Sequence, residues 1–210
     1  MAQLAVSVAA GSQSVTLDRI VLATDFSGAA ERAAAYAQGL ARRYVSSLAL
    51  AHVVDLSAAA PFGDLAAGLS MDVMRQRTFA NLAANQHRLV EEMTSAGVRT
   101  SSHTLEAEQP AASLVRFAEG MRADLIITGT NARRGLKKVI PGSFAEGVIR
   151  HASCPVLTIG PKARPASKAD FGFRSIVVAT KFGPDAAKLV SLALSFAAAG
   201  LSVVQSRVCG

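Results

Sequence analysis

The sequence predicts an α/β protein built on a parallel sheet with helices on both faces. Short apolar runs rich in β-branched residues recur along the chain, and segments with apolar residues at helical spacing separate them. Strands that alternate with helices in this way form a parallel sheet through right-handed crossover connections. The run at residues 123–128 has the length and composition of a strand that is buried on both faces.

Five strands and four helices of this fold can be placed on the sequence. Gly97 is a typical residue just past a helix end, and Pro110 is favoured at the first helical position. Residues 55–70 form a loop with proline and glycine as breakers. The expected strands cover residues 19–24, 48–54, 98–105, 123–128 and 156–159. The expected helices cover about residues 28–44, 71–96 and 110–121, with a last one that starts near Ser143.

A glycine-bounded basic loop separates the fourth strand from the last helix. It runs from Gly129 to Ser143. Its basic residues are Arg133, Arg134, Lys137 and Lys138. Backbone N–H groups at a helix N-terminus form an anion seat, so a phosphate is the expected guest. Local structure explains the same residues equally well, since Ser143 with Glu146 makes a capping box and Gly129 lets the strand turn.

The loop resembles the nucleotide loop of the universal stress protein family, which has the pattern G-x2-G-x9-G-[S/T]. Gly129, Gly142 and Ser143 match this pattern, whereas Ala132 stands in the place of the second glycine. Residues 145–159 also resemble the last helix and strand of that family. The resemblance covers roughly residues 17–160.

This resemblance implies a doubly wound five-stranded sheet of the flavodoxin-like, Rossmann-like order 3-2-1-4-5. In open parallel sheets, ligands bind beyond the carboxyl ends of the strands, where the strand order reverses. The reversal lies between the first and fourth strands. Asp25 follows the first strand and Gly129 follows the fourth, so we expect both to face one crevice.

The resemblance also implies that ATP or another adenine nucleotide occupies that crevice. Asp25 would contact the nucleoside, the backbone of Val53 would contact the adenine, and Ser143 would reach the terminal phosphate. The expected nucleotide-binding positions are Asp25, Val53, Thr128, Gly129, Ala132, Arg133, Gly142 and Ser143. The alternatives are local: Asp25 suits the positive end of the helix that follows it, and Val53 suits a packed strand.

Ala132 leaves two functions open. A methyl group there is expected to weaken the contact with the phosphates, because alanine adopts a positive φ at a cost of about 1–2 kcal/mol. The first function is a stress-response regulator that binds ATP weakly. The second is a protein-interaction or dimerisation module of the same fold that has lost its ligand.

Neither catalysis nor metal binding is expected. No acid–base or nucleophilic residue set is evident, and the P-loop motif is absent, so we expect no enzyme, with slow ATP hydrolysis as a third reading. His151 and Cys154 are three residues apart, but Pro155 separates them structurally from a shared site. The aromatic-poor loops give no support for a flavin.

Charge and hydropathy exclude other partners. Residues 1–160 hold 15 Lys and Arg against 13 Asp and Glu, and residues 161–210 hold 7 against 2, so the basicity is mostly in the tail. Basicity of this kind is weak evidence for a nucleic-acid partner, so we expect no nucleic acid. Residues 189–204 carry no charge but are shorter than the roughly 20 residues of a membrane span, so we expect no membrane partner.

Residues 1–14 lack the basic segment of a signal peptide, so we expect a loose leader, residues 1–16, on a cytoplasmic protein.

The end of the chain looks like a repeat of its beginning. Residues 176–182 match residues 20–26 at an offset of 156. We therefore expect one domain at residues 17–160, a linker at 161–172 and a truncated second copy at 173–210. Lys181 aligns with Asp25, so the second copy would lack the site. The apolar strand Val156–Ile159 would lie at a sheet edge, which favours a homodimer.

Overall fold

The computed structural model describes residues 16–57, 68–130, 143–163, 173, 176–179, 186–197 and 205–207. The chain divides into two compact units. One unit is Leu17–Ala166, and the other joins Met1–Thr16 to Ser167–Gly210. The expected leader and most of the expected linker fall outside the described residues.

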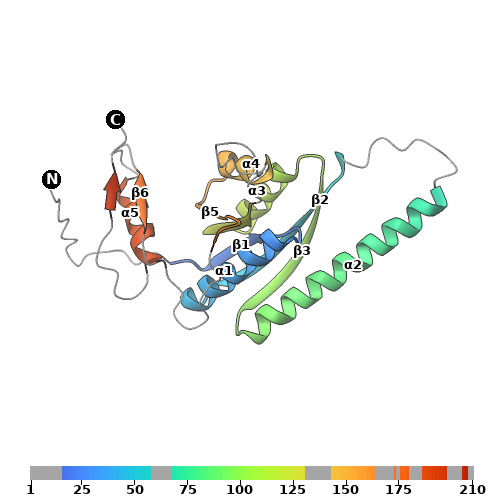
Figure 1. Ribbon diagram of the computed structural model, residues 1–210, viewed down its shortest axis with the longest axis horizontal. Helices are drawn as coiled ribbons and strands as arrows, with labels where there is room; N and C mark the ends of the chain where they lie inside the picture. The colour runs from blue at the N-terminus through green and yellow to red at the C-terminus, as the bar shows by residue number, and fades with distance from the viewer. Residues whose placement is uncertain are drawn as a thin grey trace. The chain divides into compact units, whose positions relative to one another are not determined.

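A five-stranded, all-parallel sheet forms the centre of the first unit (Figure 1). Its strand order is β3-β2-β1-β4-β5, and helices surround it, so the expected doubly wound fold is confirmed. Each strand lies within two residues of its predicted bounds. The strands are β1 Arg19–Ala23, β2 Ser47–Asp55, β3 Arg99–Ala107, β4 Leu125–Gly129 and β5 Val156–Ile159.

The three central strands run in register to the same edge of the sheet, where β2 continues to Asp55, past its last pair with β1. Ala23, the last residue of β1, lies opposite Ala51 of β2 and Thr128 of β4. Thr24 continues the pairing, because its backbone N–H donates to the carbonyl oxygen of Ala51 at 2.9 Å. The carboxyl ends of β2, β1 and β4 therefore meet at one edge of the sheet, where the strand order reverses.

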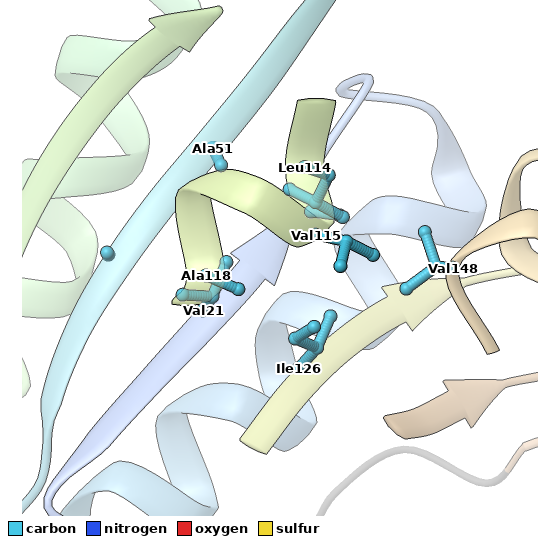
Figure 2. Close-up of a cluster of buried hydrophobic side chains, with 9 residues drawn as sticks. Val21, Ala51, Leu114, Val115, Ala118, Ile126 and Val148 are labelled. Carbon is cyan, nitrogen blue, oxygen red and sulfur yellow. The ribbon is translucent and has the colours of Figure 1, made fainter. Parts of the chain in front are cut away.

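Four helices cover the two faces of the sheet. They are α1 Gly28–Tyr44, α2 Gly68–Ser95, α3 Pro110–Gly120 and α4 Ser143–His151. On one face, Val21 and Ile126 pack against Leu114 and Val115 of α3 and Val148 of α4 (Figure 2). Successive side chains of a strand point to opposite faces. The fully buried residues between these positions, such as Leu22 and Ile127, therefore face the side that α1 covers.

The long helix α2 packs through only part of its length. It lies alongside β3 in Figure 1, and Leu89 and Met93 are buried. Helical spacing predicts that Phe79 shares this apolar face, but Phe79 is 40 % exposed, so that prediction is wrong. Ten residues of helix span about 15 Å, which places Phe79 well beyond the buried contacts of Leu89.

Two predicted helix boundaries are confirmed by their geometry. Gly97 has φ +82°, and the N–H of Val98 donates to the carbonyl of Met93 at 3.0 Å, which closes the end of α2. Pro110 is the first residue of α3. Because α3 follows β3 directly, its first residues lie at the carboxyl edge of the sheet.

The second unit contains a strand, a helix and a strand. They are β6 Val177–Ala179, α5 Ala186–Ser195 and β7 Gln205–Arg207, and the two strands pair in parallel. This is the order of elements that the repeat predicts, while descent from a second domain copy remains a prediction. Among the described residues, no helix is long and apolar enough to cross a membrane.

Candidate functional site

A cavity of about 650 Å³ opens at the carboxyl ends of the central strands. Strands β1, β2 and β4 and the beginnings of α1, α3 and α4 all contribute to it. Most of the lining side chains are small, which leaves the space open. The described lining residues are Ala23, Thr24, Asp25, Ser27, Ala29, Ala30, Ala51, Val53, Asp55, Gln109, Pro110, Ala111, Ala112, Thr128, Gly129, Thr130, Phe144, Ala145, Gly147 and His151.

Gly129 forms the floor of the cavity by close approach to α1. A Cβ atom at this position would lie 2.4 Å from the carbonyl oxygen of Ala29 and 2.8 Å from the nitrogen of Ala30. Both neighbours are backbone atoms, so no side chain can move aside to make room. The glycine is therefore required because the end of β4 packs directly against the first turn of α1. A turn alone, as the simpler explanation had it, does not account for the contact.

Asp25 lies at the rim, in a turn that starts α1. Its Oδ1 accepts a hydrogen bond from the N–H of Ser27 at 3.0 Å, and the Ser27 hydroxyl accepts one from the N–H of Ala30 at 3.4 Å. The carboxylate is exposed. Asp25 thus shapes the start of α1 and lines the cavity at the same time.

A small polar cluster supports the turn after β1. The N–H of Phe26 donates to the Thr24 hydroxyl at 3.1 Å, and Phe26 has φ +57°, which is unusual for an aromatic residue. His52 Nδ1 lies 2.8 Å from the carbonyl oxygen of Thr24. A carbonyl only accepts, so Nδ1 carries the hydrogen. The rings of Phe26 and His52 are 5.3 Å apart, which fixes the turn that holds Asp25.

The wall opposite Gly129 comes from the end of β2 and the start of α3. Val53, Asp55 and Gln109 line it. The sequence points to Asp25 as the one evident carboxylate of the crevice, but Asp55, which ends β2 at the same edge, is a second. Asp55 Oδ1 accepts from the N–H of Ser57 at 2.9 Å and from its hydroxyl at 2.6 Å, so this carboxylate also belongs to a local turn.

The part of the cavity at the end of β4 is lined by Thr128, Gly129 and Thr130. Thr128 and Thr130 are buried, and the N–H of Thr130 donates to the carbonyl of Ile159 at 2.9 Å, which extends the β4–β5 ladder past Gly129. Helix α4 begins at Ser143, and Glu146 pairs with Arg150 at 2.8 Å. The side chain of Ser143 and the loop residues Ala132, Arg133, Arg134, Lys137, Lys138 and Gly142 lie outside the described residues.

No metal centre is evident in the described part of the chain. It holds no group of three His, Cys, Asp or Glu side chains placed to bind a metal ion. His151 Nδ1 lies 2.8 Å from the carbonyl of Gly147, so its hydrogen is committed to the end of α4. Burial raises the pKa of the Cys154 thiol, which disfavours the thiolate that metals bind.

Four of the eight expected binding positions line the one cavity: Asp25, Val53, Thr128 and Gly129. Sequence reasoning missed Asp55 and Gln109. Both could have been found, because Asp55 ends a parallel strand and Gln109 precedes the proline that starts α3, which places both at the carboxyl edge. It also missed Phe144 and His151, whose spacing along α4 puts them on one side of the helix.

The fold and the cavity define a doubly wound α/β protein with a cavity at its switch point. The model of the universal stress protein family matches residues 16–160. A universal stress protein of Methanocaldococcus jannaschii is 33 % identical over 141 residues, which cover 67 % of this chain and 81 % of that relative. The chain therefore belongs to the universal stress protein family.

Solved structures show the same fold. A protein of this family from Burkholderia pseudomallei is 30 % identical with a TM-score of 0.51, and the match covers 71 % of this chain and 97 % of the other. A universal stress protein solved in complex with cAMP is 20 % identical with a TM-score of 0.51. That match covers 70 % of this chain and 98 % of the other.

Proposed function

We propose that the protein is a cytoplasmic regulator that binds ATP or another adenine nucleotide weakly in the cavity between Asp25 and the loop after Gly129. One observation carries the proposal: residues from three strand ends that were expected to hold a nucleotide line a single cavity. The volume of about 650 Å³ falls within the roughly 300–1,000 Å³ of small-molecule sites.

The helix arrangement favours an anionic ligand. The first turns of α1, α3 and α4 all line the cavity, through Ala29 and Ala30, Pro110 and Ala111, and Phe144 and Ala145. The N-terminus of each helix carries a partial positive charge from the aligned peptide dipoles. Three helix N-termini directed at one cavity attract a phosphate more strongly than any single one.

The remaining lining is suited to a nucleoside. Apolar surface from Val53, Ala51 and Phe144 offers contact to a flat base, and the Asp25 carboxylate at the rim can accept hydrogen bonds from a ribose. A protein of this fold has been solved with cAMP, which is an adenine nucleotide. That likeness supports the ligand class through the fold, and the choice of nucleotide rests on the cavity of this chain.

A regulatory rather than a catalytic role follows from the two carboxylates. Asp25 and Asp55 each accept a hydrogen bond from the backbone N–H two residues ahead, at 3.0 and 2.9 Å. These hydrogen bonds hold both carboxylates in turns at the rim, which is a structural role. We therefore propose that binding changes protein contacts, with no chemistry on the ligand.

The decisive experiment restores the missing glycine. Ala132→Gly should tighten ATP binding about ten- to a hundredfold, because one charge-assisted backbone contact is worth roughly 1.5–3 kcal/mol and 1.4 kcal/mol is tenfold. Isothermal titration calorimetry measures both affinities. Adding Asp25→Ala to the glycine variant should reverse the gain, whereas adding Gln38→Ala, a residue of α1 outside the lining, should not.

Two outcomes distinguish this function from the interaction module. An adenine nucleotide should copurify with the protein. Denaturation should release it, and mass spectrometry should identify it. If neither the parent nor Ala132→Gly binds ATP, ADP, AMP or cAMP, the nucleotide function is wrong. The substitution of glycine by Ala132 would then mark a domain that acts only through protein contacts.

A further inference from the structure

The cavity has two ends of different chemistry. At one end are Gly129, Thr130 and the start of α4, where the proposed function places the phosphates. At the other end are Val53, Asp55 and Gln109, two strands away. Neighbouring strands are about 4.8 Å apart, so Val53 and Gly129 are separated by roughly 10 Å across the sheet, and Asp55 lies further along β2. A nucleotide whose phosphates lie at the first end places its base at the second.

Gln109 carries the chemistry that a base requires at that end. It occupies the N-cap position of α3, yet its side chain makes no capping hydrogen bond. Glutamine is not among the side chains that commonly cap a helix N-terminus. The carboxamide has two N–H donors and one carbonyl acceptor, so it can offer one of each to a ligand.

Asp55 beside it is unsuited to read the base. A carboxylate only accepts, so its best partner among the bases is guanine, which presents two neighbouring N–H groups. Pairing with both would use both carboxylate oxygens. Oδ1 of Asp55 already accepts the N–H and the hydroxyl of Ser57, at 2.9 and 2.6 Å. With Oδ1 engaged in this turn, Asp55 does not offer both carboxylate oxygens to guanine.

We propose that Gln109 reads the base and selects adenine over guanine by pairing with its N6 and N7 atoms. This inference rests on the proposed nucleotide site. The carbonyl of the carboxamide accepts from the N6 amino group, and its N–H donates to N7, a pairing that glutamine makes with adenine. Guanine presents two acceptors, O6 and N7, on the same edge, so one carboxamide cannot satisfy both.

The test compares ligands that differ at single atoms. ATP, 7-deaza-ATP and GTP are titrated into the full chain, with Ala132→Gly as the background if the parent binds weakly. The protein should prefer ATP over 7-deaza-ATP, which lacks the N7 acceptor, and over GTP, each by about tenfold. In Gln109→Leu both preferences should fall to near unity, and Gln109→Glu should lower ATP affinity because its carboxylate faces the N7 lone pair.

Ratios of affinity separate this role from general damage to the site. Asp25→Ala should weaken all three ligands without changing their ratios, and Gln38→Ala should change nothing. If ATP binds but is not preferred, or if Gln109→Leu keeps the preference, the inference is overturned and the nucleotide site stands. If no nucleotide binds to either background, both the proposed function and this role of Gln109 are wrong.

Discussion

Val45 ends α1 in a conformation that a β-branched residue rarely adopts. Its φ of +56° and ψ of +33° lie in the left-handed region, and its N–H donates to the carbonyl of Ala41. The side chain is 78 % exposed, so it contributes little burial in return. The strained conformation therefore lowers the stability of the fold, and burial of the Val45 side chain does not offset it.

Val45→Gly should increase stability. Relief of the left-handed conformation is worth about 1–2 kcal/mol, and the greater freedom of glycine in the unfolded chain subtracts roughly 0.4–1 kcal/mol. The expected net gain is about 1 kcal/mol, or roughly 2–4 °C in Tm for a domain of this size. Thermal unfolding followed by circular dichroism measures it. Val45→Ala keeps the Cβ atom and serves as the control, so an equal gain in both variants would contradict the strain argument.

Gly129 joins two elements, since it lets β4 end against the first turn of α1. Gly129→Ala should lower the free energy of unfolding by about 1–3 kcal/mol, the usual range for overpacking, because its methyl group would meet backbone atoms at 2.4–2.8 Å. Denaturant titration measures the loss. Gly120→Ala is the matched control, because nothing lies within 4 Å of a Cβ atom there. If Gly129→Ala lowers the free energy of unfolding no more than Gly120→Ala, β4 and α1 can move apart to accommodate the methyl group.

The elements of the first unit could be predicted closely from the sequence, and their contacts could not. Periodicity and the signals at Gly97 and Pro110 place strands and helix ends, because these depend on local backbone preferences. The contact of Gly129 with Ala29 joins residues 100 apart, and no local pattern encodes it. The exposure of Phe79 was mispredicted for the same reason. Spacing shows which residues share a face of α2, but not how far along the helix the packed elements extend.

The site shows the same division. Asp25, Val53, Thr128 and Gly129 could be predicted from motif resemblance, which records positions along the chain. Gln109 and Asp55 carry no motif, and they join the cavity only because the strand order brings β2 and the start of α3 to the same edge. Such residues follow from topology once the fold is known.

At the scale of the whole molecule, we propose a homodimer through β5, which is an edge strand of the sheet. Pro155 and Ile159 direct their carbonyls to β4, so the alternate residue Thr158 directs its backbone groups outward. Sedimentation at micromolar concentration should show a dimer. Thr158→Pro should shift it to monomer, because proline removes an outward donor and edge strands tolerate proline. Thr158→Val keeps the N–H and should stay dimeric, and a monomeric parent would refute the interface.

We expect the second unit to be cut first by proteases, because a two-stranded sheet is only marginally stable by itself. Strand β6 pairs with β7 alone among the described strands, and Val177 is 69 % exposed. We propose that this unit is a partial copy of the first domain. Limited proteolysis with mass analysis should remove residues 161–210 and leave 17–160 whole. Cleavage inside 17–160 while the tail stays intact would contradict this division.

The convergence of three helix N-termini on one edge also bears on how quickly a ligand arrives. Fixed backbone charges act before any contact is made, and they turn an approaching anion toward the edge that can hold it. A weak site of this kind can still fill rapidly, so its occupancy follows changes in ligand concentration with little delay. Low affinity and fast exchange together are properties of a sensor, whereas a tight site would hold its ligand long after the concentration had fallen.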